Sequence, residues 1–274
     1  MKKAYHRILY LGSLLLAGLL LSFSNGTLAT EYSAQNPYKP SAQEIRTLQQ
    51  IIPDFPEAPP MGYHTQFYKE KYVISNHPPG MFKYFVYVPQ NYNPETAYPS
   101  VLMLHSGARH MYGGSDFFEK ELHKKYNAIL IVPIVPPGYD WNSGAPLALE
   151  ALQDVAKNYK LDPNRIYLTG YAMGGIGVYS LLARYPNIFA GAWSACGTYD
   201  PKLVNSIDKT VPLLVWHGQK DGTFPVQIIR DIHKRLKSSK HNIAYIEQSD
   251  ASHADCLKIY EKTGFWKWLF DQKR

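Results

Sequence analysis

From about residue 63 onward, short apolar runs alternate with amphipathic stretches along the chain. Ile129–Val132 and Leu213–Trp216 are continuously apolar, which is typical of strands that are buried on both faces of a sheet. Pro146–Tyr159 instead spaces its apolar residues three and four positions apart, which predicts a helix. Strands that alternate with helices favour a mostly parallel sheet flanked by helices. We therefore expect one α/β domain over residues 63–274.

The same patterns predict the remaining elements. The expected strands are Tyr72–Ser75, Tyr84–Val88, Val101–His105, Ala128–Pro133, Arg165–Thr169, Gly191–Ala195, Leu213–His217 and Ile243–Ile246. The expected helices are Asp116–Tyr126, Pro146–Tyr159, Gly175–Tyr185, Val226–Lys237 and Lys258–Asp271. The turn Asn76–Gly80 joins the first two strands like a hairpin, so we expect an antiparallel pair at this edge of the sheet.

The first 29 residues have the three parts of a secretory signal: a basic start, an apolar centre and small residues at the end. The apolar run, Ile8–Leu21, is shorter than the ~20 apolar residues that a membrane span needs. We expect cleavage after Ala29, export to the periplasm or the medium, and no stable membrane anchor afterwards. The proline-rich residues 30–62 are expected to wrap the domain, with one short helix at Ser41–Ile51.

Composition and charge narrow the possible partners. The chain of 274 residues is 45% hydrophobic and 19% charged, which excludes a disordered chain. The formal net charge of +7 falls to +4 without the leader, because Lys2, Lys3 and Arg7 leave with it. No block of Lys and Arg with interleaved aromatics is present, so we expect no nucleic-acid partner. The sequence also has no phosphate-cradling loop, metal-ligand cluster or dinucleotide fingerprint, so we expect no cofactor.

The strongest chemical signal is the segment Arg165–Gly177, where an expected strand passes through a glycine-framed turn directly into a helix. This is the context of a nucleophile elbow, G-x-S-x-G. Gly170 and Gly174 frame the turn, because neighbouring backbone packs closely against it. The central residue is Ala172, however, and not serine.

Two further residues follow later strands in the order in which a catalytic triad needs them. Asp221 lies in the loop after the strand that ends at Trp216, and could orient a histidine or merely form a turn. His253 follows the next strand and is the candidate base, or else a surface histidine. Elbow, acid and histidine in this order are typical of α/β hydrolases. The backbone N–H groups of Met173 and Gly107 are the candidate oxyanion donors.

The chain resembles the α/β-hydrolase superfamily, in the branch of secreted carboxylesterases that includes polyhydroxybutyrate-depolymerase-like and feruloyl-esterase-like enzymes and proteins described as predicted peptidases. The segments that carry the resemblance are Tyr98–His105, the elbow, Pro212–Pro225 and Trp268–Arg274. It implies a small-molecule or polymeric ester as ligand, and Asp221 and His253 as acid and base.

The resemblance also implies a substrate pocket lined by His105, Ser106, Trp141 and Tyr171, although Trp141 could equally be local packing. The sequence departs from the family at two positions. Ala172 stands where the family has its nucleophile, and Ser106 stands where the oxyanion loop usually has glycine. Ser194 is the one serine near the elbow that could replace the nucleophile, but no glycine turn follows it at the spacing that an elbow needs.

Both cysteines, Cys196 and Cys256, lie in the mature part of an exported chain, near the same edge of the expected sheet. They are expected to form a disulfide, the alternative being two buried free thiols.

A methyl group at position 172 cannot form an acyl-enzyme. Loss of the nucleophile costs enzymes of this chemistry about a million-fold in turnover, with about a thousand-fold acceleration left. Three hypotheses follow: a natural pseudoenzyme that binds without cleaving, an active esterase whose serine has been changed to alanine, and a hydrolase in which Asp221 and His253 activate water directly.

The leader generates the first test. N-terminal sequencing of the secreted or periplasmic protein is expected to begin at Thr30, because the small residues before it form the cleavage site. A soluble cytoplasmic protein that retains Met1 would contradict export.

Overall fold

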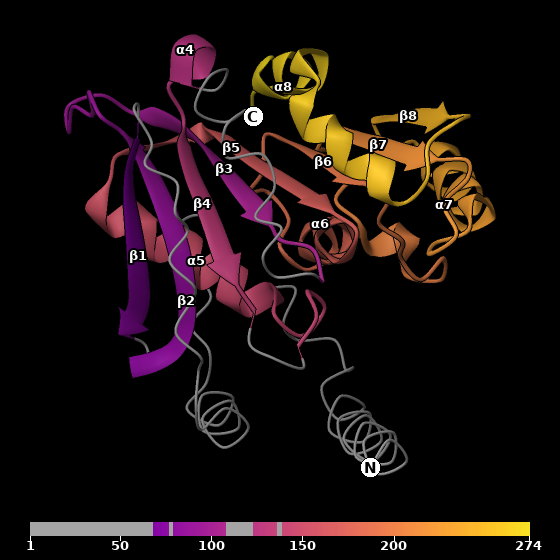
Figure 1. Cartoon of the computed structure of the whole chain (residues 1–274), viewed down its shortest axis with the longest axis horizontal. Coiled ribbons are helices and arrows are strands. Elements are labelled where there is room, and N and C mark those ends of the chain that lie inside the picture. The colour runs from indigo at the N-terminus through magenta and orange to yellow at the C-terminus, as the bar shows by residue number, and fades with distance from the viewer. Residues whose placement is uncertain (1–67, 77–78, 108–122, 136–138) are drawn as a thin grey trace. The chain divides into compact units, whose positions relative to one another are not determined.

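The computed structural model describes residues 68–76, 79–107, 123–135 and 139–274, and all of them lie within one compact unit. Eight strands form one sheet in the order β1-β2-β4-β3-β5-β6-β7-β8 (Figure 1). β2 pairs antiparallel with both β1 and β4, and every other pair is parallel. The expected mostly parallel sheet with an antiparallel hairpin at one edge is therefore confirmed.

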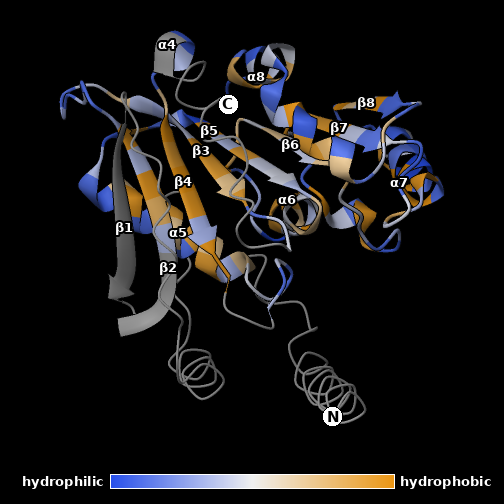
Figure 2. Cartoon of the chain, viewed as in Figure 1, coloured by the Kyte–Doolittle hydropathy of each residue, from blue (hydrophilic) through white to orange (hydrophobic). Residues whose placement is uncertain are grey.

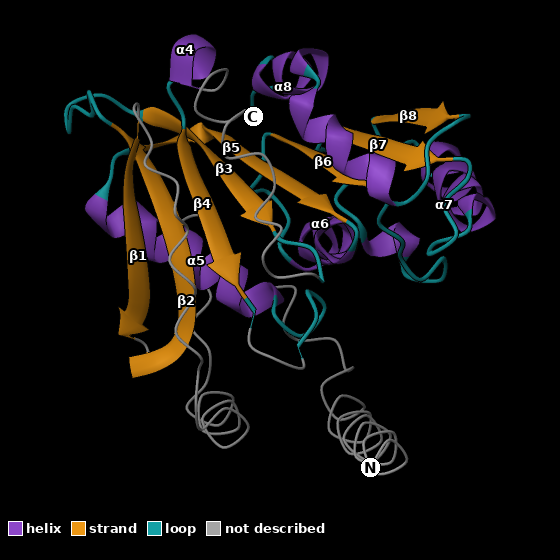
Figure 3. Cartoon of the chain, viewed as in Figure 1, coloured by secondary structure: helices purple, strands orange, loops and turns teal. Residues whose placement is uncertain are grey.

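The strands lie close to their expected positions, and most are longer by a few residues. They are β1 (Tyr68–Asn76), β2 (Pro79–Pro89), β3 (Tyr98–Leu104), β4 (Ile129–Ile134), β5 (Leu161–Tyr171), β6 (Gly191–Ala195), β7 (Leu213–Gly218) and β8 (Ile243–Gln248). The helices are α4 (His123–Tyr126), α5 (Ala145–Asn158), α6 (Met173–Arg184), α7 (Val226–Ser238) and α8 (Thr263–Phe270), with short 3-10 helices η2 (Val204–Ser206) and η3 (Ala254–Glu261) (Figure 3).

One expected helix is wrong as a single element. The stretch Lys258–Asp271 is divided at Lys262, whose backbone is extended, into the end of η3 and α8. The two pieces stay in contact because the indole N–H of Trp266 donates to the carbonyl of Tyr260 over 2.8 Å. The start of the expected helix Asp116–Tyr126, the expected helix Ser41–Ile51, the leader and the segment 30–62 lie outside the described residues.

The residues of β4 are almost all apolar (Figure 2), and buried apolar residues form a core on each face of the sheet, as the continuous apolar strands predicted. Alternate residues of β3 show the division. Leu102 and Leu104 join the core shared with α5, α6 and α7, whereas Val101 and Met103 join the core shared with η3 and α8. Because β3 is buried on both faces, its carboxyl end is held rigidly in the middle of the sheet.

The loops that carry the candidate catalytic residues all follow the carboxyl ends of parallel strands. Because β3, β5, β6, β7 and β8 are parallel neighbours, the loops that follow them lie side by side at one end of the strands. The order of the strands thus brings together residues that lie up to about 150 positions apart in the sequence.

The expected disulfide is present. Cys196 follows β6 and Cys256 lies in η3, with their Cα atoms 5.9 Å apart. The bond joins residues that are 60 positions apart, and the enclosed segment contains β7, α7 and β8.

Closing a loop of this length stabilises a protein by about 4 kcal/mol in the loop-entropy model. We therefore expect a reductant to lower the midpoint of thermal unfolding of the mature protein strongly. The double variant Cys196→Ser/Cys256→Ser should show the same lower midpoint and no response to reductant. Thiol counting on the unreduced, unfolded chain should find no free thiol; two free thiols would refute the bond.

Candidate active site

The elbow is formed by the junction of β5 and α6. Ala172 is the one residue between them and has φ 54° and ψ −115°, a conformation that L-residues rarely adopt. The backbone around it is well bonded: the N–H of Ala172 donates to the carbonyl of Ala195 over 2.9 Å, and Ile176 N–H donates to the carbonyl of Ala172 over 3.0 Å. The chain therefore keeps the strained backbone of a nucleophile elbow although its side chain is a methyl group.

The glycines around the elbow are required by close backbone contacts. A Cβ atom at Gly170 would overlap the carbonyl group of Gly174, and one at Gly174 would overlap the carbonyl group of Leu104. Gly175 and Gly197 approach each other in the same way, backbone against backbone. The sequence predicted the first two contacts from the elbow motif; the contact with Gly197 ties the elbow to the loop after β6.

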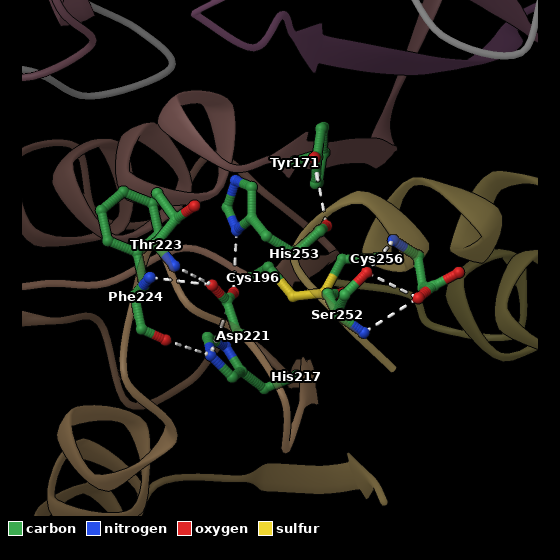
Figure 4. Close-up of a disulfide and its surroundings, with 10 residues drawn as sticks. Tyr171, Cys196, His217, Asp221, Thr223, Phe224, Ser252, His253 and Cys256 are labelled. Carbon is green, nitrogen blue, oxygen red and sulfur yellow. Dashed lines mark hydrogen bonds and ion pairs between the residues drawn. A yellow bond between two sulfur atoms is a disulfide. The ribbon is translucent and has the colours of Figure 1, made fainter. Parts of the chain in front are cut away.

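Asp221 and His253 face each other across the ends of β7 and β8 (Figure 4). His253 Nδ1 lies 2.8 Å from Asp221 Oδ2, and this carboxylate side chain is fully buried. The other oxygen, Oδ1, accepts the backbone N–H groups of Thr223 and Phe224, both over 2.8 Å. Since a carboxylate only accepts, Nδ1 carries the proton. The arrangement leaves Nε2 of His253 as the ring nitrogen available to a reacting group.

The two loops that carry this pair are joined through their backbones. The N–H groups of Gln219 and Lys220 donate to the carbonyls of Gln248 and Ala251, each over 2.9 Å. A Cβ atom at Gly218 would overlap the carbonyl of Ala251, so glycine at this position permits the loops to meet.

The disulfide links the base to the elbow. The N–H of Cys256 donates to the carbonyl of His253 over 3.1 Å, and Cys196 directly follows Ala195, the acceptor for the elbow N–H. The covalent bond therefore connects the segment that carries His253 with the strand end that supports Ala172.

Two aromatic rings flank the imidazole of His253. Tyr171, the residue before Ala172, has its ring centre 5.3 Å away, and its hydroxyl donates to the carbonyl of His253 over 3.1 Å. Phe224 lies edge-on to the imidazole, also at 5.3 Å. Burial, together with the negative charge of Asp221, raises the pKa of Tyr171, so its hydroxyl stays protonated as a donor. Both rings restrict the rotation of the base.

The side chains of His105 and Trp141 are both buried. The imidazole is 2% exposed and the indole 0%. His105 Nδ1 lies 2.7 Å from the carbonyl of Ser106, and its Nε2 accepts the N–H of Val135 over 3.1 Å. Trp141 donates from its indole to the carbonyl of His105 over 2.8 Å. These hydrogen bonds attach the segment that follows β3 to Val135 and Trp141.

The other candidates of this region occupy different positions. Ser106 is buried and bonded within the loop, and Gly107 is exposed at the end of the described segment. Met173 opens α6, so its N–H is one of the first-turn donors that have no acceptor within the helix. Ser194 is fully buried and donates to the carbonyl of Gly175 over 3.0 Å, which makes it a packing residue.

Sequence reasoning missed His217 and Phe224, which both touch the acid–base pair. Phe224 packs on His253, and Nε2 of His217 lies 3.4 Å from Asp221 Oδ2. The spacing of four residues between His217 and Asp221 was a possible signal, but a histidine within an apolar strand reads first as a core residue.

One group of described residues has the spacing of metal ligands. Cys196, Asp221 and Cys256 bring three ligand atoms within 4.8 Å of one another, but both sulfurs are bonded in the disulfide. They therefore offer no thiolates while the bond is intact. Within the described ranges, no helix has the length and apolar character needed to cross a bilayer.

The site contains most of the groups that acyl transfer requires. A helix N-terminus meets a strained turn, and a buried carboxylate holds an imidazole in one tautomer at the same edge of the sheet. Such a pair removes a proton from an attacking oxygen and returns it to a leaving group. The oxygen of a side-chain nucleophile is the missing part, because position 172 carries a methyl group.

Comparison with known proteins agrees with this geometry. The dienelactone hydrolase family model matches residues 142–258, a little under half of the chain. The bifunctional acetylxylan esterase/xylanase XynS20E of Neocallimastix patriciarum is 25% identical over 92 residues, which are 34% of this chain and 14% of that protein. The chain thus spans only a small part of this curated relative.

Solved structures share the fold at low identity. A thermostable esterase has a TM-score of 0.65 at 24% identity, covering 77% of this chain and 64% of that one. The CE1 ferulic acid esterase from Anaeromyces mucronatus, solved in complex with ferulic acid, has a TM-score of 0.60 at 14% identity, covering 78% and 93%. The strand order, the elbow between β5 and α6, and the matched segment all lead to the same assignment. The chain has the α/β-hydrolase fold, and its residues 142–258 match the dienelactone hydrolase family model.

Proposed function

We propose that this chain is an exported, ester-binding protein of the carboxylic-ester hydrolase type that does not cleave its ligand by acyl transfer. One observation carries the proposal: the chain combines an Asp221–His253 pair and a strained elbow with a methyl group at position 172. The parts that recognise and polarise an ester are separable from the nucleophile. Substitution of the nucleophile alone removes about six orders of magnitude of turnover and leaves the binding machinery in place.

Carboxylic esters, either small or attached to a polymer, are the ligand class that we propose. Proteins that this chain resembles include an acetylxylan esterase and a ferulic acid esterase, and both names describe hydrolases of carboxylic esters. The oxyanion donors that we propose, the N–H groups of Met173 and Gly107, would polarise the carbonyl of such an ester. His253, oriented by Asp221, would interact with the alcohol side through its Nε2.

Export is part of the proposal and is supported by two features. The leader has the order of a secretory signal, and the disulfide is of the kind that persists in oxidising compartments.

Two alternatives make different predictions for the same site. In an active esterase whose serine has been changed to alanine, the pocket and oxyanion hole are intact and only the oxygen is missing. In a hydrolase that uses Asp221 and His253 to activate water, position 172 has no chemical role. The intact carboxylate–imidazole pair is compatible with both, so activity measurements decide.

Restoring the oxygen is the direct test. The mature chain is expected to ignore an active-serine phosphonate probe and barely to hydrolyse a p-nitrophenyl ester. Ala172→Ser should gain labelling and raise turnover by at least about a hundred-fold, because the base and its acid are already in place. The double variant Ala172→Ser/His253→Ala should lose this gain.

Ser194→Ala in the Ala172→Ser chain is the matched control, because Ser194 is a buried serine near the elbow that donates to Gly175; it should leave labelling unchanged. Full recovery of esterase activity would favour the serine-to-alanine variant of an active enzyme. No recovery would mean that the oxyanion loop with Ser106 is also disabled and would favour a binding role. Strong activity of the Ala172 chain, lost in His253→Ala, would overturn the proposal in favour of activated water.

A further inference from the structure

A second histidine lies behind the acid–base pair. His217, near the end of β7, is fully buried, and Asp221 lies between it and His253 (Figure 4). Its Nε2 lies 2.9 Å from the carbonyl oxygen of Phe224 and 3.4 Å from Asp221 Oδ2. Asp221 Oδ2 therefore faces an imidazole on each side, one from β7 and one from the loop after β8.

The contacts fix which proton His217 carries. A carbonyl oxygen only accepts, so Nε2 holds the proton and donates to Phe224 as its shorter contact. Burial lowers the pKa of His217, so the ring is neutral. A neutral donor stabilises the carboxylate without cancelling its charge, and the charge stays available to His253.

The contact between His217 and the carbonyl of Phe224 matters because Phe224 makes two other contacts with the acid–base pair. Its backbone N–H donates to Asp221 Oδ1 over 2.8 Å, and its ring packs edge-on against His253. A displacement of this one residue would loosen the carboxylate and the base together.

We infer that His217 is a positioning residue for the Asp221–His253 pair, which acts by fastening the loop 221–224 to the end of β7. The inference rests on the proposed function in that Asp221 and His253 are taken as the acid–base pair. The plainer interpretation is a core histidine that only supplies stability. The two interpretations differ for a folded variant that lacks the donor of His217. The positioning role predicts that the hydrogen bond between His253 and Asp221 is weakened, whereas a purely structural role predicts that it is unchanged.

The bond itself provides a readout that needs no nucleophile. An imidazole proton held by a buried carboxylate exchanges slowly with water and gives a separate low-field proton NMR signal. In the mature Ala172 chain this signal of His253 is expected to be present, to be lost in His217→Leu and His217→Asn, and to persist in His217→Gln. Leucine has no donor and asparagine is too short to reach Phe224, whereas the amide of glutamine can stand in for Nε2.

His241 is the matched control. It is also a buried histidine, 8% exposed, with its ring nitrogens 3.1 Å and 2.9 Å from the carbonyls of Leu236 and Ile207. His241→Leu should keep the His253 signal even if it lowers the midpoint of unfolding. In the Ala172→Ser chain, His217→Leu should reduce kcat by about 10- to 100-fold with little change in KM, since it misplaces a catalytic group rather than the ligand.

Each outcome bears on one proposal or the other. Folded His217→Leu or His217→Asn with the signal intact would overturn the positioning role. The same holds if both variants fail to fold while His241→Leu folds, because the role of His217 is then structural. If Ala172→Ser is inactive but the signal responds to His217 as expected, the proposed function fails and the positioning role stands.

Discussion

The structure depends on one close contact, the approach of bare backbone to bare backbone around the elbow. Gly170 and Gly174 lie against each other, and Gly174 also lies against the carbonyl of Leu104. These contacts leave no room for a side chain, so the chain must turn sharply from β5 into α6 and hold Ala172 at a positive φ. This sharp turn places the N-terminus of α6 near the ends of β3 and β6. A side chain at Gly170 or Gly174 would overlap backbone carbonyl groups, so β5, α6 and the end of β3 could not approach as closely as they do.

The second constraint is the desolvation of a carboxylate. Burial of Asp221 would be costly if the ion were unpaired. Two backbone N–H groups and two imidazoles surround its oxygens and offset that cost. A surface turn needs no such arrangement, so the number of donors around Asp221 argues that the site is organised around a negative charge. Under the proposed function, Asp221 and His253 are the acid and base of a catalytic triad whose nucleophilic oxygen is absent at position 172.

Much of this was accessible from the sequence because it follows from chain geometry. Apolar strands alternating with helices predicted the sheet, and the glycine spacing predicted the elbow. Cys196 follows β6 and Cys256 follows β8, at the same end of the parallel strands, so their pairing was also predictable. The direction of individual side chains could not be predicted. His105 and Trp141 lie in loop segments near the expected site, and the sequence around them does not indicate that both side chains are buried. The break at Lys262 was missed although residues 261–264 are polar or glycine, because helical apolar spacing resumes directly after them. His217 was missed because its partner, Phe224, is reached only through the fold of the loop between them.

The disulfide has a consequence for the lifetime of the site. The bond encloses every residue from Gly197 to Asp255, including Asp221 and His253. A protease that cuts once within this segment would not separate the two fragments, because the bond between Cys196 and Cys256 still joins them. The exposed loops around α7 and β8 lie within this enclosed segment. Cleavage in one of these loops would therefore leave the two fragments covalently joined. A nicked molecule would thus retain acid, base and elbow as a covalent unit, a useful property wherever proteases share the solution.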